Sequence, residues 1–509
     1  MNLLRKRHAG ITRAVTVAIA VLLQLITMFI LVTLLQEYVS WFYILFEIFS
    51  IFLVCMLVND GQDYEFYWVI IVLILPVFGF FLYFMWGRKR TNSREYRRFR
   101  EVKEKGLKYK KQDEDVIREF RLLHPNKAQI SRLLIHYGYP LYKNTQVTYF
   151  PVGERKFEAL IKDMRQATRF IFLEYFIIYE GKIWEEIKEI LKEKISQGVE
   201  VRLLFDDFGS LMINTEEFRH ELAVMGVRFG IFSPIHEGTS RLTFNYRNHQ
   251  KIAIIDGNIG YTGGVNIGDE YANIYERFGH WKDTAVRLEG DGVWGLTCIF
   301  LEMWEFVKGY EDLDYTKYKS LYSMETAGFV QPMADGPANN PSNPIEETYT
   351  HMINKAREYI YFTTPYLVLD EKMVNDLCRA ARSGVDVRII TPRKYDKWYV
   401  YMVTVSNYGK LLANGVKIYE YVPGFIHSKT AVADDECAIC GSINMDYRSF
   451  YLHYECGVFM SENKAVLDIR DDILETIEKS QQIFYDAWKK RPVHQRIIQW
   501  CLRLFSPIL

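Results

Sequence analysis

The chain lacks any surplus of charge, because 63 Lys and Arg residues balance 63 Asp and Glu residues over 509 positions. A protein that binds nucleic acid through bulk electrostatic attraction needs a basic excess. The zero net charge therefore argues against nucleic acid as a partner. The length is sufficient for several domains with a sizeable core.

The chain also lacks a disulfide framework. It has seven cysteines, an odd number, and they are widely spread. That pattern does not fit a small secreted domain. Cys437 and Cys440 form a CxxC, but no second pair or neighbouring histidine completes a zinc site. Because they lie in a strand-like segment, we expect them to be buried, reduced thiols.

Charged residues are scarce before Arg88, where three apolar runs occupy positions of about 14–35, 41–58 and 66–86. Each run is close to the roughly 20 residues that a membrane-spanning helix needs. The first run is too long for a signal peptide, and no small-residue cleavage site follows it. We therefore expect a transmembrane region at 1–87.

A basic segment follows, and we expect 88–145 to be a juxtamembrane linker. The positive-inside rule places it, and everything after it, in the cytoplasm of a multi-pass cell-membrane protein. Basic residues from Arg5 to Arg13 also favour the cytoplasm. Three crossings cannot satisfy both ends, so the number of crossings and the orientation of the N-terminus stay open. The basic segment either binds anionic head groups or simply flanks the last crossing.

The remainder of the chain contains an internal repeat with an offset near 190 residues. Three pairs of segments resemble one another in the same order: 167–174 and 356–363, 198–205 and 384–391, 225–229 and 414–418. Each half reads as strand, helix, strand, helix, strand, which implies helices on the faces of largely parallel strands. The sequence thus predicts an α/β protein with two similar mixed-sheet lobes related by a pseudo-two-fold.

The predicted boundaries follow from composition. We expect lobe 1 at 146–328 and lobe 2 at 346–490. The intervening segment 329–345 is rich in proline, glycine and asparagine and is predicted to be a linker. The tail at 491–509 is amphipathic, and it either seeks a membrane interface or docks on the lobes.

One motif occurs at the equivalent place in each half. It reads His249-x-Lys251-x4-Asp256 in the first half, followed by Gly264 and Asn266. In the second half, the corresponding residues are His427, Lys429, Asp434, Ser442 and Asn444. On a strand, residues i and i+2 share a face, so each histidine and its lysine should point the same way. Two such matches at equivalent places are hard to obtain by chance.

Two histidines can share one phosphodiester: one imidazole attacks phosphorus while the other protonates the leaving alkoxide. Four further donors are available for the non-bridging oxygens: Lys251, Lys429, Asn266 and Asn444. Such donors would replace a metal ion, so we expect no metal and no cofactor. Asp256 and Asp434 close apolar strands, and we expect them to be more structural than chemical.

The twin HxKx4D motifs resemble the phospholipase D superfamily. The apolar N-terminus, the stretch Asn444–Phe450 and the length are similar to bacterial cardiolipin synthases, although the first apolar run is extra. The resemblance implies that His249 is the covalent nucleophile and His427 the general acid and then base, with the reverse assignment left open. It also implies that Asp283 orients His249 and that Glu455 orients His427.

By this resemblance, the enzyme moves a phosphatidyl group between two phosphatidylglycerol molecules to give cardiolipin and glycerol through a phosphohistidine. Its partners would be phosphatidylglycerol and cardiolipin in the bilayer. The same residues also fit a hydrolysing phospholipase D or a transferase that uses another alcohol. A nuclease of the same superfamily and a non-catalytic membrane scaffold are less consistent with the charge balance and with two complete motifs. The oligomeric state is not accessible from the sequence.

Overall fold

The computed structural model describes residues 94–234, 246–309, 313–322, 324–339 and 342–503, together with the single positions 41, 48, 68 and 83. The chain divides into two units, 1–89 and 90–509. The three apolar runs lie almost entirely outside the described residues, so the transmembrane region stays a prediction. Within the described ranges, no helix has both the length and the apolar character that a bilayer crossing requires.

Three helices begin the second unit: α5 (Arg94–Leu107), α6 (Glu114–Leu123) and α7 (Ala128–His136). Tyr96 and Phe99 on α5 join the hydrophobic core, because they lie on one side of an amphipathic helix. Phe120 on α6 and Leu134 on α7 are fully buried in the same core. The described part of the expected juxtamembrane linker is therefore a folded part of the domain.

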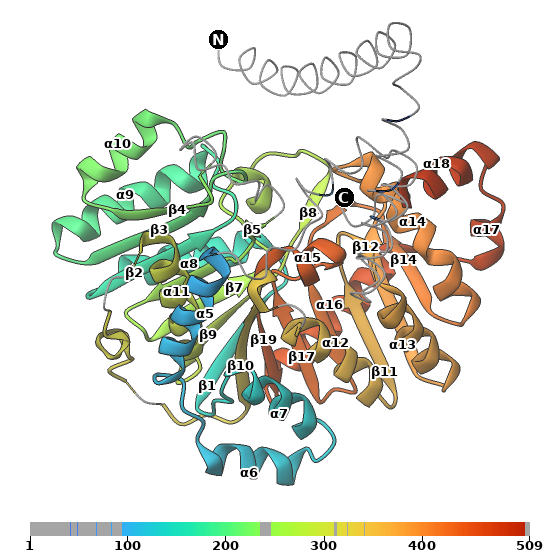
Figure 1. Ribbon diagram of the computed structural model, residues 1–509, viewed down its shortest axis with the longest axis horizontal. Helices are drawn as coiled ribbons and strands as arrows, with labels where there is room; N and C mark the ends of the chain where they lie inside the picture. Colours follow the sequence, from blue (N-terminus) through green and yellow to red (C-terminus); the bar gives the residue numbers. More distant parts are fainter. Residues whose placement is uncertain are drawn as a thin grey trace, which may run out of the picture. The chain divides into compact units, whose positions relative to one another are not determined.

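The first lobe contains a seven-stranded sheet with the order β1-β9-β7-β6-β2-β3-β4 (Figure 1). Its strands are β1 (Thr145–Phe150), β2 (Phe170–Tyr175), β3 (Glu200–Asp206), β4 (Arg228–Phe232), β6 (Ile252–Ile255), β7 (Ile259–Gly263) and β9 (Ala285–Gly290). Strands β2, β3 and β4 are parallel, as expected for strands joined by helices. The other neighbouring strands pair in antiparallel fashion. Among them, β6 and β7 form a hairpin joined by a tight turn.

The second lobe repeats this order as β10-β19-β17-β16-β11-β13-β14 and adds β20 at the edge. Its strands are β10 (Phe329–Asp335), β11 (Tyr359–Thr363), β13 (Asp386–Pro392), β14 (Lys417–Tyr421), β16 (Thr430–Ala433), β17 (Cys437–Gly441), β19 (His453–Ser461) and β20 (Ser480–Ile483). Each strand of the first sheet has a counterpart in the second. The predicted mixed-sheet α/β repeat is thus confirmed, with fewer parallel pairs than expected. Cys437 and Cys440 are buried free thiols in β17, as predicted.

The segment predicted to be a linker at 329–345 is not one over its first seven residues. They form β10, whose residues are all buried and pair with β19. Proline is tolerated there because β10 is the first strand in the sheet order, and an edge strand need not donate every backbone N–H. The prediction failed because proline and glycine indicate a turn without showing whether an edge strand precedes it.

Helices cover the sheets (Figure 1). They are α8 (Gly153–Arg165), α9 (Lys182–Ser196), α10 (Glu216–Met225), α11 (Val293–Lys308), α12 (Pro344–Lys355), α13 (Glu371–Arg382), α14 (Trp398–Ala413), α15 (Tyr447–Tyr451), α16 (Lys464–Glu478), α17 (Tyr485–Lys489) and α18 (Val493–Arg503). In the tail, α18 packs against α14 while Trp500 stays 68% exposed. The described part of the tail therefore docks on the second lobe with an apolar residue facing outward.

Two short strand pairs connect the lobes. Strand β8 (His280–Lys282) of the first lobe pairs in parallel with β15 (Gly424–Ile426) of the second. Strand β5 (Arg247–Asn248) of the first lobe pairs in parallel with the beginning of β19. Each pair leads directly into a motif histidine, so the fold brings both histidines to the junction between the lobes.

Candidate active site

The strand pairs between the lobes set the position of each histidine backbone. Asn248 is in register with Tyr454, so the next residues are His249 and Glu455. Ile426 is in register with Lys282, so the next residues are His427 and Asp283. The His249 amide donates to the Tyr454 carbonyl at 2.8 Å, and the His427 amide donates to the Lys282 carbonyl at 2.7 Å. Each motif histidine thus begins beside a carboxylate of the other lobe.

Side chains of its own lobe fix the strand that leads to His249. The Asp206 carboxylate accepts a hydrogen bond from the Asn248 amide at 3.0 Å. The Glu174 carboxyl accepts from Asn248 Nδ2 at 2.7 Å. Burial raises the pKa of Glu174 to about 8, so this group is mostly protonated at neutral pH. These contacts hold the segment before His249 against strands β2 and β3 of the first lobe.

Each histidine is bonded to its carboxylate through Nδ1. His249 Nδ1 lies 2.8 Å from Glu455 Oε1, and His427 Nδ1 lies 2.6 Å from Asp283 Oδ2. An ionised carboxylate only accepts hydrogen bonds, so each Nδ1 carries the proton and donates it. In the neutral ring, Nε2 then keeps its lone pair, as a nucleophile or base requires.

The carboxylates are exchanged relative to the sequence-based prediction, which assigned Asp283 to His249 and Glu455 to His427. The prediction paired each histidine with the acid of its own half. It was wrong because the parallel strand pairs cross between the lobes. Sequence spacing alone does not reveal that crossing.

The two carboxylates are held in different ways. Glu455 accepts hydrogen bonds from the Ser442 hydroxyl and, at 2.7 Å, from the Ser449 hydroxyl. Asp283 accepts from the Thr284 amide at 2.9 Å and lies against Gly264. A Cβ atom at Gly264 would approach Asp283 Oδ1 to 2.1 Å. The motif position that carries serine in one half therefore has to be glycine in the other.

Burial and neighbouring cations favour the neutral form of both imidazoles by lowering their pKa values. Burial, followed by the charges of Lys251 and Lys429, holds the pKa of His249 well below its usual value. Burial and Lys429 lower the pKa of His427 to about 4, although Asp283 opposes this shift. The charge of His427 also acts on His249, as expected for rings that share one site.

The two motif lysines are buried and lie outside the lining of the cavity described below. Lys251 Nζ donates to the His249 carbonyl at 2.5 Å, and Lys429 Nζ donates to the His427 carbonyl. Burial lowers the pKa of Lys251 to about 7 and that of Lys429 to about 8. They contact the backbone of the histidines and influence the site through their charge.

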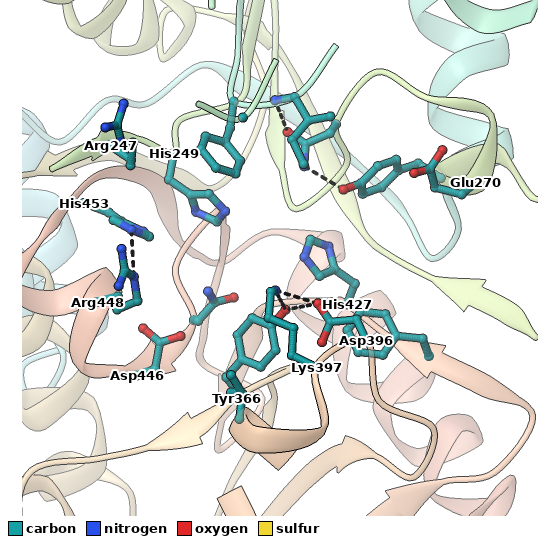
Figure 2. A pocket seen from close by; sticks show the side chains of 18 of the residues that line it. Arg247, His249, Glu270, Tyr366, Asp396, Lys397, His427, Asp446, Arg448 and His453 are labelled. Atoms are coloured by element: carbon teal, nitrogen blue, oxygen red, sulfur yellow. Dashed lines mark hydrogen bonds and ion pairs between the residues drawn. The ribbon is translucent and has the colours of Figure 1, made fainter. Parts of the chain in front are cut away.

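Both histidines line a single cavity of about 720 Å³, and Figure 2 shows their rings within it. Asn266 and Asn444 line it as well. Asn266 donates to the Tyr271 hydroxyl at 3.0 Å and accepts from the Ile177 amide, so its amide is engaged. The buried Oδ1 of Asn444 has no hydrogen-bond partner among the described residues. This oxygen can only accept a hydrogen bond, so a phosphate oxygen would have to be bound by Nδ2 of the same amide, which also interacts with Asp446.

Comparison with known proteins agrees with this geometry. Residues 160–276 and 349–477 match the family described as "Cardiolipin synthase, PLD-like domain". The chain is 36% identical to cardiolipin synthase 2 of Bacillus anthracis, over 91% of this chain and 90% of that protein. It is 35% identical to the cardiolipin synthase of Geobacillus kaustophilus (strain HTA426), over 91% and 92% of the two chains. The chain belongs to the bacterial cardiolipin synthase family.

A solved phosphatidylserine synthase from Haemophilus influenzae Rd KW20 shares the fold of the cardiolipin synthase family, with a TM-score of 0.58. The likeness covers 75% of this chain and 97% of that structure at 14% sequence identity. The family and fold expected from the twin motifs are thus confirmed.

Several charged residues of this family member line the cavity but were not predicted: Arg247, Glu270, Asp396, Lys397 and Arg448. Arg247 could have been found from the sequence, because it lies only two residues before the motif histidine His249. Arg448 lies within the Asn444–Phe450 stretch that carries the family resemblance. Asp396 and Lys397 lie in a loop after β13, and nothing in the local sequence distinguishes them from surface charges.

One group of side chains in the cardiolipin synthase site has the composition of a metal centre. The ligand atoms of His249, His453 and Glu455 all lie within 4.8 Å of one another. Glu455 already accepts from His249 and two serines, and Arg448 donates to His453 Nε2 at 3.3 Å, whereas His453 Nδ1 has no hydrogen-bond partner among the described residues. An ion on Glu455 would have to displace the hydrogen bonds that fix His249.

The motif aspartates lie outside the cavity lining, each at the end of a strand. Asp256 accepts from the amides of Arg169 and Phe170 at 2.7 and 2.9 Å. Asp434 accepts from the amide of Glu358 and from Lys127 Nζ at 2.9 and 2.8 Å. Both aspartates adopt a positive φ, of 55° and 56°, which Asp tolerates better than most residues. They tie the turn after the motif strand to the start of the neighbouring strand.

Replacing Asp434 with Ala should destabilise the protein by about 2 kcal/mol, because it leaves buried donors without an acceptor. Thermal unfolding of the purified protein in detergent measures the change. Asp468→Ala, which removes a partly exposed acid on α16, is the matched control and should leave the stability unchanged. An Asp434→Ala protein with unaltered stability but no activity would instead assign this residue to the chemistry.

Proposed function

We propose that the protein is a cardiolipin synthase, a phospholipid phosphatidyltransferase. It joins two phosphatidylglycerol molecules into cardiolipin and releases glycerol. One observation carries the proposal: two histidines, each held by a carboxylate from the other lobe, line one cavity in a chain of this family. That arrangement provides two imidazoles for one phosphodiester.

In the first half-reaction, Nε2 of His249 attacks the phosphorus of the first phosphatidylglycerol. A P–N bond forms, and the P–O bond to the glycerol head group breaks. His427 gives its proton to the departing oxygen, so glycerol leaves and a phosphatidyl group stays on His249. The catalytic step needs a cationic His427, and the negative charge of a bound phosphodiester favours that form.

In the second half-reaction, a hydroxyl of another phosphatidylglycerol attacks the same phosphorus. His427 accepts the hydroxyl proton as the new P–O bond forms and the P–N bond breaks. His249 returns to its neutral form, and His427 is again protonated. The sum of both steps converts two phosphatidylglycerol molecules into one cardiolipin and one glycerol.

The electrostatics support His249 as the nucleophile. Burial, followed by the charges of Lys251, Lys429 and Lys397, holds the pKa of His249 well below its usual value. Burial, Lys429 and Lys251 also lower the pKa of His427, but only to about 4, because Asp283 and its hydrogen bond oppose them. The reaction requires a neutral imidazole as the nucleophile and a second imidazole that can be protonated to act as the general acid.

The remaining roles extend this proposal. Lys251 and Lys429 counter the charge that develops on the phosphorane oxygens, while Nδ2 of Asn444 donates to one of them and Asn266 shapes the wall beside it. The reaction then requires no metal or cofactor. We further propose that the 1–87 region anchors the protein in the cell membrane with the catalytic domain in the cytoplasm, where phosphatidylglycerol reaches the cavity from the bilayer.

The purified protein, given phosphatidylglycerol with labels in its glycerol head group and its acyl chains, should yield cardiolipin and free glycerol in equal amounts. Phosphatidic acid in place of cardiolipin would identify a hydrolase and contradict the proposal. The His427→Asn variant should gain acyl label on the protein slowly, because it lacks the acid of the first step, and should then retain it, because it lacks the base that activates the acceptor. His249→Asn should retain none.

His220→Asn replaces an exposed histidine on α10 and is the matched control, with unchanged turnover and no retained label. Label retained by His249→Asn but absent from His427→Asn would reverse the two assignments.

The pH dependence should differ between free and occupied enzyme. A bound phosphodiester raises the pKa of His427 above its value of about 4 in the empty site. The alkaline limb of kcat should therefore lie at higher pH than that of kcat/KM. Asp283→Asn removes a group that raises the pKa of His427, so it should move the kcat limb to lower pH. Superimposable profiles of kcat and kcat/KM would contradict this role of His427.

A further inference from the structure

The two sides of the cavity differ in chemistry although the lobes repeat the same fold. Strands β3 and β13 occupy equivalent places in the two sheets, and the loop after each lines the cavity. The loop after β3 contributes Phe208 and Gly209, whereas the loop after β13 contributes Asp396 and Lys397. The two equivalent loops thus differ, because the lining residues are apolar after β3 and charged after β13.

The polar cluster consists of Tyr366, Asp396 and Lys397, and its bonds converge on one oxygen. The Tyr366 hydroxyl donates to Asp396 Oδ2 at 2.6 Å, and Lys397 Nζ donates to the same Oδ2 at 2.7 Å. Lys397 Nζ also donates to the Tyr366 hydroxyl at 3.0 Å (Figure 2). No hydrogen bond from the described residues reaches Asp396 Oδ1. The cluster therefore fixes a carboxylate with one oxygen left for a ligand.

Asp396 is held in its ionised form. Burial opposes ionisation, but Lys397, Tyr366 and the charge of His427 together keep the pKa of Asp396 below its usual value. An ionised carboxylate accepts hydrogen bonds and offers none, so its ligand has to be a donor. Asp396 lines the same cavity as His427, and Figure 2 shows its carboxylate on the side of the cavity where the His427 ring lies.

We propose that the Tyr366–Asp396–Lys397 cluster is a binding site for the vicinal hydroxyl of a glycerol head group. This inference rests on the proposed function and names the feature of the substrate that the site recognises. Asp396 Oδ1 accepts a hydrogen bond from the hydroxyl on the carbon next to the reacting oxygen. Lys397 and Tyr366 orient the carboxylate from its other side.

One contact serves both half-reactions. The glycerol that leaves carries a free hydroxyl on the carbon adjacent to its departing oxygen. The phosphatidylglycerol that arrives carries a free hydroxyl on the carbon adjacent to its attacking oxygen. His427 handles the reacting oxygen in each case, so the neighbouring hydroxyl falls in the same place. Water and simple monohydric alcohols lack this group, which favours transfer to glycerol over hydrolysis.

The experiment compares two acceptors that differ in this hydroxyl. The purified full-length protein receives unlabelled phosphatidylglycerol with labelled glycerol and labelled 1,3-propanediol together at equal concentration, and the label that each delivers to lipid is measured. The wild type should prefer glycerol, and Asp396→Asn should lower the ratio of glycerol transfer to 1,3-propanediol transfer by roughly 10- to 100-fold, as for a lost hydrogen bond to a charged group. This ratio does not depend on the first half-reaction, because both acceptors share it.

Asp471→Asn, which removes an exposed acid on α16, is the matched control and should keep the wild-type preference. An unchanged ratio of the two products in Asp396→Asn would overturn the inference. A wild type without preference for glycerol would overturn it independently of how any variant folds. A wild type that prefers glycerol but makes no cardiolipin would contradict the proposed function and leave the hydroxyl site in place.

Discussion

The exchange of short strands between the lobes is the constraint on which the site depends. β5 pairs with β19, and β8 pairs with β15, so each lobe supplies the histidine of one pair and the carboxylate of the other. Backbone register, rather than side-chain attraction, brings His249 to Glu455 and His427 to Asp283. Neither lobe contains a complete histidine–carboxylate pair, so duplication has made a single site between two incomplete halves.

Near-symmetry gives the reaction two similar imidazoles, and small departures from symmetry give them different tasks. Glu455 accepts hydrogen bonds from two serine hydroxyls. Asp283 instead lies against Gly264, which occupies the position of Ser442 in the other half and has no side chain to donate. Asp283 supports a cation on His427, while lysine charges keep His249 neutral. The Asp396 loop adds polarity beside His427 only. These differences would let one half of the cavity hold the phosphatidyl group while the other handles the alcohol.

The sequence predicted the repeat, the family and the residues of the active site, because the order of the strands and the twin motif can be recognised from local sequence patterns. It could not predict which carboxylate meets which histidine, since the paired residues lie 206 and 144 positions apart in the chain. It missed β10 because Pro332 and Gly336 resemble a turn, and it missed the folding of α5 to α7 because a basic segment can hide an amphipathic face. Asp396 was inaccessible because only tertiary structure distinguishes a cavity acid from a surface acid.

The two-histidine site implies that the phosphatidyl group passes through a covalent bond to His249 while His427 transfers the proton at the reacting oxygen. The most direct measurement is the stereochemical course of transfer from phosphatidylglycerol that is chiral at phosphorus. Each in-line displacement inverts the configuration, so attack by His249 followed by attack of the acceptor should give overall retention. Overall inversion would mean that the acceptor attacks phosphatidylglycerol directly, and the two-histidine account would be wrong.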